Sequence, residues 1–502
     1  FQVSDATLEV SSDAPPLTHG RVAGTITGRT TRIRDVTADL RMADGRALTI
    51  SEGSFVIPEI TPDTVEARIG LRLGGVRALH IALGLGAIFA FTCIKFRPGA
   101  LDHHNVQLVL MMWIAALLSE QGGRVREHMA AGIAAALAIA IGAEPVPLVA
   151  AACFCVVMRW IWQGPAFAAG ARAFGLSLAL GVTVVFLATV PPRDYAVVTC
   201  DSLSFGFYSL SALGGAGLFT LSWLFARGSL FARVVASAVL GGLIAATTLL
   251  VAPQCLASPL AGLDPMLVEL WLNSVTEAQS VFSEIRQSPG AAPAFYAVGL
   301  VAMILCLVRA WRGQLPGFHL LFFVLVAASW GIALVQVRGA FFANMLAIPP
   351  FALLIADLQQ RVRENPKDVR VAAAFLATGL AAVPAAWGVA GILLMEGYKS
   401  LRFDSLNTAQ AEDAVSCDRQ IDTITLAGME PGLVAAPSNS GANILRFTPH
   451  RVLSAPYHRN QGGMLTELHI GMAPPAEALA RLKYAGVSII AFCPTDPQTS
   501  HI

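Results

Sequence analysis

Long apolar runs separated by short polar connections dominate the middle of this sequence. Each run is close to the ~20 residues that an α-helix needs to cross the hydrocarbon core of a bilayer. We therefore predict eleven membrane-spanning helices, at residues 76–96, 105–119, 128–143, 145–162, 173–191, 204–226, 232–252, 292–311, 317–336, 339–357 and 371–395. The pattern predicts a polytopic α-helical membrane domain over residues 76–395.

The first 75 residues have a different pattern, in which polar and apolar positions alternate, as in Arg32–Val36 and Val65–Leu73. Alternating runs with turn residues between them predict a small all-β segment over residues 1–75. This segment resembles the long β-strand repeats of AsmA-like proteins, which lie in the periplasm. The chain also begins at Phe1 rather than Met. We therefore expect a fusion or a fragment in which this segment replaces the natural start of the membrane domain.

The last part of the chain, residues 396–502, mixes short β-like runs with a helix-like stretch. The β-like runs are Gly432–Ala436 and Val487–Phe492, and the helix-like stretch extends from Pro475 to Ala485. A mixture of this kind predicts a small α/β domain outside the membrane.

Composition agrees with a membrane protein, because 55% of the 502 residues are hydrophobic and only 13% are charged. The mean hydropathy of +0.62 points the same way. These values exclude an ordinary soluble enzyme. The net charge of +1 says nothing about nucleic acid, and we expect no nucleic-acid partner for a protein of this class.

Basic residues in the connections predict the orientation, because loops rich in Lys and Arg stay on the cytoplasmic side. One set of alternate connections holds twelve of them: Arg124, Arg126, Arg159, Arg172, Arg227, Arg233, Arg309, Arg312, Arg361, Arg363, Lys367 and Arg370. The other set holds five: Lys95, Arg97, Arg193, Arg286 and Arg338. We therefore expect a bacterial inner-membrane protein whose 97–104 and 253–291 connections and C-terminal domain face the periplasm.

Four of the eight cysteines lie in the predicted external segments, namely Cys200, Cys255, Cys417 and Cys493. Disulfides persist in an oxidising compartment such as a periplasm. We predict the pairs Cys200–Cys255 and Cys417–Cys493, of which the second would close the C-terminal domain, although other connectivities stay open. Asp201, beside the first cysteine, is a candidate cap for the following helix.

The connection between the first two predicted spans, Arg97–Asn105, carries the sequence Asp-His-His. The spacing from Asp102 to His104 lets a carboxylate and an imidazole converge on one divalent cation. Alternatively, Asp102 caps the helix that starts near Asn105, where the helix dipole favours a negative charge. The two roles are compatible.

Two further residues stand at predicted outer connections. Glu277 lies in the long 253–291 connection, where a carboxylate could complete a metal site or could simply be solvated. Arg338 lies where two late spans meet, and its guanidinium suits bidentate binding of a lipid pyrophosphate. The alternative for Arg338 is an interfacial side chain that extends toward the lipid headgroups.

Taken in order, these motifs resemble a known family. An Asp-His-His loop after Arg-Pro-Gly, a Ser-Val-Thr-Glu sequence in a later external loop and an Arg between two late spans resemble the catalytic subunits of oligosaccharyltransferases. More broadly they are similar to class-C (GT-C) glycosyltransferases, which use polyprenyl-linked sugar donors. The resemblance covers residues 76–502.

The resemblance implies roles for individual residues. Asp102 and His104 match the acidic motif that binds the catalytic divalent cation, Mn2+ or Mg2+. Glu277 matches the loop glutamate that contributes to the metal site and helps hold the acceptor. Arg338 matches the arginine that contacts the donor phosphate.

The sequence departs from the family pattern in two places. Residues 1–75 stand where the family carries a loop with its first catalytic Asp. The loss of that Asp would make this chain inactive, so activity of the chain stays an open question here. The C-terminal domain lacks the Trp-Trp-Asp motif that reads the acceptor sequon. It carries instead a cluster of polar groups that is a candidate acceptor site or an ordinary surface loop: His450, Arg451, Tyr457, His458, Arg459 and Asn460.

From these observations we predict a membrane enzyme that transfers a sugar or oligosaccharide from a polyprenyl-(pyro)phosphate donor to a periplasmic acceptor, with a divalent cation as cofactor. Its partners would be the donor and membrane lipid. The alternatives are a non-catalytic membrane scaffold and a transporter of lipid-linked sugars in envelope biogenesis. A transporter should carry ionisable residues near the bilayer midplane, whereas the notable charges here lie at span ends.

Overall fold

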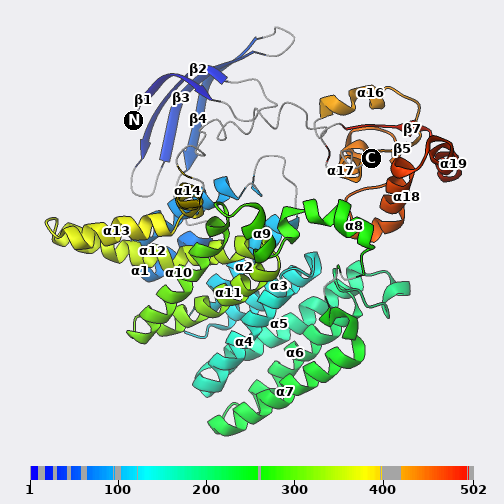
Figure 1. The fold of residues 1–502 in the computed structure, drawn as a ribbon. Coiled ribbons are helices and arrows are strands. Elements are labelled where there is room, and N and C mark those ends of the chain that lie inside the picture. Colours follow the sequence, from blue (N-terminus) through cyan, green and yellow to red (C-terminus); the bar gives the residue numbers. More distant parts are fainter. Residues whose placement is uncertain are drawn as a thin grey trace.

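The computed structural model describes residues 2–8, 17–26, 31–41, 47–57, 65–93, 95–96, 103–120, 122–257, 260, 262–395, 397, 420–493 and 496. Figure 1 shows a helical bundle together with an N-terminal sheet and a small C-terminal domain. The N-terminal sheet is antiparallel, in the order β1-β2-β3-β4. Its strands are β1 (Gln2–Leu8), β2 (Leu17–Ile26), β3 (Thr31–Arg41) and β4 (Ala47–Ile57). The prediction of a strand at Arg32–Val36 is confirmed, because these residues lie in β3.

The predicted strand at Val65–Leu73 is wrong, because these residues begin helix α1 (Val65–Thr92). The same sequence also places apolar residues at positions 65, 69 and 73, a spacing of four that suits one face of a helix. Ile69 is only 1% exposed, so burial of that face favours the helix over the strand. The helix is kinked at Gly75, whose φ of 68° is a conformation that glycine adopts easily.

The bundle continues with helices of widely different lengths. They are α2 (His103–Leu118), α3 (Val125–Ile141), α4 (Val146–Gln163), α5 (Pro165–Thr189), α6 (Phe205–Leu224), α7 (Leu230–Val251), α8 (Pro265–Leu270), α9 (Val281–Gln287), α10 (Ala292–Trp311), α11 (Pro316–Val335), α12 (Arg338–Glu364), α13 (Val369–Ala381) and α14 (Pro384–Met395). Short 3-10 turns lie between them: η1 (Pro192–Asp194), η2 (Pro253–Leu256), η3 (Leu272–Ser274) and η4 (Thr276–Ala278).

Each predicted span coincides with a helix, and the last one coincides with the pair α13 and α14. Among the described residues, eight helices are long and apolar enough to cross a membrane, or nine if the bent pair counts as one span. Helices α2 and α3 have 16 and 17 residues and are shorter than these. The prediction of a multi-pass α-helical membrane protein is confirmed, while the number eleven stays a prediction.

The pair α13 and α14, which bends by 92°, carries the chain back across the bundle. Helix α12 ends at Glu364, at the end of the bundle opposite Arg338. Helix α14 packs beside the start of α10, because a side chain at Gly391 would collide with the carbonyl of Gly290. That start lies at the Arg338 end, so the two bent helices together act as one broken crossing.

Helix α12 forms the centre of the bundle. In its most apolar window 89% of the residues are buried, against 11% in α7. It packs against α1, α10 and α11, and it contributes Phe342, Leu346 and Phe351 to the main apolar core. Helix α7 therefore lies at the periphery with its apolar surface outward, as expected for a helix in contact with lipid. Arg338, the first residue of α12, is consequently placed at the middle of one end of the bundle.

The C-terminal domain contains a three-stranded parallel sheet in the order β6-β5-β7. Its elements are η7 (Gln420–Thr423), α16 (Ile424–Ala427), β5 (Leu433–Ala435), α17 (Ser438–Phe447), β6 (Arg451–Val452), η8 (His458–Asn460), α18 (Gln461–Met472), α19 (Pro475–Ala485) and β7 (Ile489–Ile490). The predicted helix from Pro475 to Ala485 and the predicted α/β character are confirmed. The other C-terminal predictions agree with β5 and β7.

The C-terminal domain contacts the long 253–291 connection through an apolar cluster. Leu267 of α8 and Trp271 pack against Met464 and Leu468 of α18. Figure 1 shows α8 and α18 side by side. This connection is therefore not a free loop, because it joins the C-terminal domain to the bundle.

The predicted disulfide between Cys200 and Cys255 is present, with the Cα atoms 5.1 Å apart. It joins the loop before α6 to η2 after α7. Cys493 is also disulfide-bonded. Its predicted partner Cys417 lies outside the described residues, so that pair stays a prediction.

Asp201, beside this disulfide, does not cap the following helix as predicted. Helix α6 begins at Phe205, and Asp201 instead binds two residues of η8. Its Oδ2 is 2.7 Å from His458 Nε2 and 2.8 Å from Arg459 Nε. Burial would raise the pKa of Asp201, but the hydrogen bonds and charge of Arg459 and His458 outweigh it and lower that pKa. Two partners 257 and 258 residues away thus bind this carboxylate in place of the start of α6.

We expect the change Asp201→Ala to loosen the C-terminal domain by about 2 kcal/mol, which is typical for losing charge-assisted hydrogen bonds. Hydrogen exchange of the α18 amides would measure this opening. Asp194→Ala is the matched control, because Asp194 is in the same loop and, among the residues that the structure describes, forms an ion pair with the adjacent Arg193 alone. Equal exchange in the two variants would contradict the docking role of Asp201.

Candidate functional site

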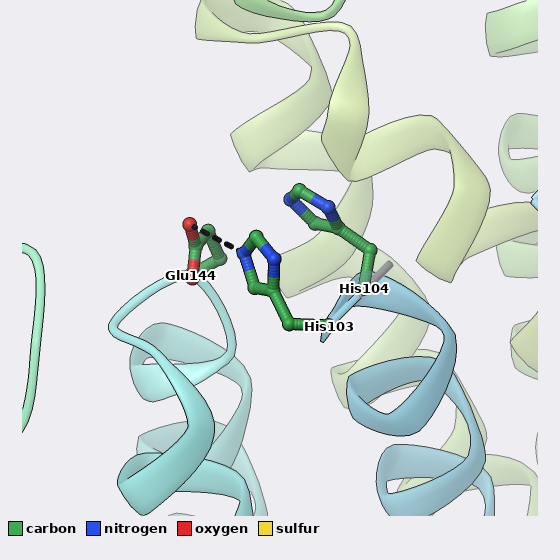
Figure 2. Close-up of side chains that lie close together, drawn as sticks. All are labelled: His103, His104 and Glu144. Carbon is green, nitrogen blue, oxygen red and sulfur yellow. Dashed lines mark ion pairs between the residues drawn. The ribbon is translucent and has the colours of Figure 1, made fainter. Parts of the chain in front are cut away.

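Three potential metal ligands meet at one end of the bundle. His103 and His104 begin α2, and Glu144 lies in the short connection between α3 and α4. Each offers one ligand atom, and these atoms all lie within 4.8 Å of one another. Figure 2 shows Glu144 reaching toward the ring of His103, with His104 beside it. Ligand atoms on one ion at bond lengths of ~2.1 Å are about 3 to 4 Å apart, so small side-chain rotations would bring all three onto one cation.

Glu144 is held as an anion by its neighbours. Its Oε1 is 3.6 Å from His103 Nε2, and its Oε2 accepts a 2.9 Å hydrogen bond from Gln107 Nε2. Burial alone would raise the pKa of Glu144, but the hydrogen bonds from His103 and Gln107 outweigh it and lower the pKa to about 2. A carboxylate that stays ionised at neutral pH is the form that binds a cation.

A glycine permits this close approach. A Cβ built at Gly142 would lie 2.5 Å from Glu144 Oε2 and 2.6 Å from Gln107 Nε2. Real Cβ atoms do not come so close to other atoms, so a side chain at this position would push the pair apart. Gly142, two residues before Glu144, thus leaves the space in which Glu144 and Gln107 meet.

Arg338 lies next to the same carboxylate. Its Nη1 is 3.5 Å from Glu144 Oε1, and its side chain is 20% exposed. Arg338 Nε is buried and has no hydrogen-bond partner among the described residues. A guanidinium has five N–H donors in a fixed planar fork. Arg338 therefore keeps donor capacity for an oxyanion placed beside the three ligands.

Glu277 approaches the site from the long connection. It lies in η4 and forms an ion pair with Lys95, which follows the end of α1. Two residues later, the carbonyl of Gln279 accepts a 2.9 Å hydrogen bond from the N–H of Val337. The segment with Glu277 is thus bonded directly to the residue before Arg338. Glu277 itself is not one of the three grouped ligands in the described part of the chain.

No family model matches the sequence of this chain. No curated protein sequence matches it either. Among solved structures, the chain is similar to the oligosaccharyltransferase AglB of Archaeoglobus fulgidus, in complex with an inhibitory peptide and a dolichol-phosphate. The TM-score is 0.53 and the identity 14%, over 86% of this chain and 56% of that chain. The chain has a fold like that of oligosaccharyltransferases.

A second structure agrees, that of the Archaeoglobus fulgidus oligosaccharyltransferase tethered through a disulfide to an acceptor peptide with the NVT sequon. The TM-score is again 0.53, with 15% identity over 85% of this chain and 55% of that chain. The chain thus spans a little over half the length of the proteins it matches. The resemblance inferred from the sequence is confirmed at the level of fold, while the likeness of residues 1–75 to AsmA-like proteins stays a prediction.

Within this oligosaccharyltransferase fold, the structure brings together some of the predicted site residues. His104 and Arg338 both lie near the carboxylate of Glu144, and Glu277 lies in the segment bonded to Val337. Asp102, one residue before His103, lies outside the described residues, so its metal and capping roles both stay predictions. The predicted residues His104, Glu277 and Arg338 thus come to one end of the bundle from three parts of the sequence, and Glu144 joins them from a fourth.

Sequence reasoning missed Glu144 and gave His103 no role of its own. The one available signal for Glu144 was a single carboxylate in a predicted outer connection, between the runs 128–143 and 145–162. Its partners are distant in sequence, since Gln107 lies 37 residues away. A single acidic residue in a short loop has no spacing pattern that marks it as a ligand. Only the fold shows that Glu144 lies beside the two histidines.

The predicted acceptor residues divide into two groups. His450 is 4% exposed, with Nε2 donating to the carbonyl of Leu426 and Nδ1 accepting from the N–H of Gly432. His458 and Arg459 hold Asp201. These three side chains thus already have partners within the protein, although Arg459 is also exposed. Arg451 and Tyr457 are exposed and Asn460 is partly buried, and these three remain candidates for acceptor contact.

A cavity of about 570 Å³ opens at the other ends of the same helices. Its lining is largely apolar and includes Leu118 at the end of α2, Trp162 near the end of α4 and Pro316 at the start of α11. None of the site residues named above lines it. A hollow so far from the ligand group does not contribute to the candidate site.

Proposed function

We propose that this protein is a membrane glycosyltransferase. It would transfer a sugar or oligosaccharide from a polyprenyl-(pyro)phosphate donor to an acceptor on the periplasmic side of a bacterial inner membrane, with the help of a divalent cation. The observation that carries the proposal is the meeting of Arg338 with the group His103, His104 and Glu144, at the end of a bundle with an oligosaccharyltransferase fold.

The ligand set fits a divalent cation of intermediate hardness. His103, His104 and Glu144 would bind it, together with Asp102, the residue before α2. Glu277 would join them if its side chain turned away from Lys95. Imidazole ligands suit transition metals better than Mg2+, so Mn2+ is the better candidate. When bound, the cation would neutralise the charge that develops on the leaving phosphate.

The other residues would bind and orient the donor. Arg338 would hold the phosphate oxygens through its planar fork of N–H groups. Glu144, which contacts Arg338 Nη1 and is bonded to Gln107, would keep that guanidinium facing the ligand group. Arg451 and Tyr457, exposed on the C-terminal domain, would contact the acceptor.

The test uses the donor pool of the source cells, which requires no knowledge of the sugar or the acceptor. We expect polyprenyl-linked saccharide to accumulate when the gene is deleted and to fall to the normal level when the intact gene is restored. In isolated membranes, EDTA should stop donor consumption and Mn2+ should restore it. Restoring the gene as Asp102→Ala should leave the donor accumulated, because the carboxylate predicted to bind the cation is lost. Equal donor pools in all strains would overturn the proposal.

A further inference from the structure

Gln279 is a buried amide in the long external connection, between η4 and α9, and is 9% exposed. Its Nε2 lies within hydrogen-bonding distance of three backbone carbonyls, at 3.1 Å from those of Leu272 and Asn273 and at 3.3 Å from that of Val275. One side chain thus closes the segment 272–279 back on itself. A buried amide without such partners would be costly, so its bonds and the fold of this segment depend on each other.

The other groups of the same residue point away from that segment. Its Oε1 accepts a 2.7 Å hydrogen bond from the hydroxyl of Ser283 in α9. Its backbone carbonyl accepts the hydrogen bond from Val337 described above. Gln279 therefore joins three parts of the chain: the segment 272–275 that contains η3, the first turn of α9, and the residue before α12.

Glu277 and Arg338, two residues of the proposed site, lie close in sequence to the residues that Gln279 joins. Glu277 lies two positions before Gln279, inside the segment that the amide closes. Arg338 follows Val337, which Gln279 binds through its carbonyl. On one flank, Trp271 anchors the closed segment in the apolar cluster with α18. A shift of this segment would therefore move Glu277 and Arg338 together.

We propose that Gln279 is the positioning residue that fixes Glu277 and Arg338 relative to each other, so that a cation and a phosphate can be held at the same time. The inference rests on the proposed function, which identifies the bound groups as a cation and a phosphate. Gln279 touches neither ligand itself and acts through the backbone of its own segment and of Val337. Residues that orient ligands in this indirect way typically change metal affinity or activity by about 10- to 100-fold when they are replaced.

The test compares two glutamines that contact the same hydroxyl. Gln279→Met keeps the size of the side chain and removes its hydrogen bonds. Gln287→Met is the matched control, because Gln287 Nε2 donates to Ser283 Oγ from the exposed side. On the purified full-length protein we would measure Mn2+ binding by electron paramagnetic resonance, binding of farnesyl phosphate with Mn2+ present, and hydrogen exchange at Val337.

We expect Gln279→Met to weaken both affinities about 10-fold or more and to speed exchange at Val337. Gln287→Met should leave all three unchanged. Ser283→Ala, a milder change that removes one of the same hydrogen bonds, should shift them in the same direction by less. If Gln279→Met does not fold, Ser283→Ala takes its place in the comparison.

Two outcomes would overturn the inference. Gln279→Met could match the control in every measurement, or it could lower thermal stability while the folded molecules keep the wild-type affinities, which would make Gln279 merely structural. If the wild type binds neither Mn2+ nor farnesyl phosphate, the proposed function fails instead. Exchange at Val337 then still decides whether Gln279 holds the start of α12.

Discussion

Replacing Arg338 with Ala is expected to lower donor turnover by about 100- to 1000-fold, the usual effect of removing one donor that stabilises a developing oxyanion. The Arg338 side chain is 20% exposed and its Nε has no hydrogen-bond partner among the described residues, so the guanidinium keeps N–H donors for an anion. The measurement is kcat/KM for the lipid-linked saccharide in membranes that carry the intact gene, together with the Kd for farnesyl phosphate.

Two further variants make this result specific. Arg338→Lys keeps the charge but loses the planar fork, so we expect an intermediate loss. Arg286→Ala should have no effect, because Arg286 is an exposed arginine in α9 at the same end of the bundle. If Arg338→Ala binds farnesyl phosphate as tightly as Arg286→Ala does, the phosphate-binding role is wrong.

The second large effect concerns the pH dependence of the C-terminal domain. Glu467 in α18 is 6% exposed. Burial raises its pKa from 4.5 to about 7, with the nearby charge of Asp496 adding to the rise and the hydrogen bond of Ser454 opposing it. The geometry agrees with a protonated carboxyl. Ser454 Oγ lies 3.2 Å from the carbonyl of Ala436 and 3.0 Å from Glu467 Oε2, and one hydroxyl proton cannot serve both acceptors.

Between pH 4.5 and 7 the folded domain therefore binds one proton more than the unfolded chain, so its stability falls as pH rises. This stability is fully present below pH 4.5 and is lost once pH passes 7, by about 3 kcal/mol in total. Glu467→Gln, which is neutral at every pH, should remove this dependence and stabilise the domain at pH 8.

Hydrogen exchange of the α18 amides at pH 5 and pH 8, corrected for intrinsic rates, is the measurement. Glu477→Gln in α19 is the control, because its carboxylate is exposed and pairs with Arg481. If Glu467→Gln and the wild type lose protection equally on going to pH 8, Glu467 is not the group responsible.

The helices of the bundle were predictable because their signal is local. A run of about 20 apolar residues is sufficient to predict a crossing, whatever the rest of the chain does. Val65–Leu73 shows where a local pattern fails, because apolar residues at 65, 69 and 73 satisfy a helix while the polar alternation satisfies a strand. Only the burial of Ile69 in the tertiary structure distinguishes the two.

The candidate site was predictable only in part. The Asp-His-His sequence and Arg338 carry recognisable chemistry at span ends, so residue type and position indicated them. The contacts of Glu144 with Gln107 and Arg338, and those of Asp201 with His458 and Arg459, join residues far apart in sequence. Such contacts depend on how the helices are arranged, and no spacing along the chain records that arrangement.

The disulfide between Cys200 and Cys255 has a mechanical consequence for the bundle. It joins the two ends of the hairpin made by α6 and α7 that lie opposite the turn, and α7 is the least buried of the long apolar helices that the structure describes. The disulfide closes α6, α7 and the turn between them into a covalent ring. Asp201, which binds His458 and Arg459, is next to this ring closure, so the C-terminal domain is attached to two cross-linked helices rather than to one.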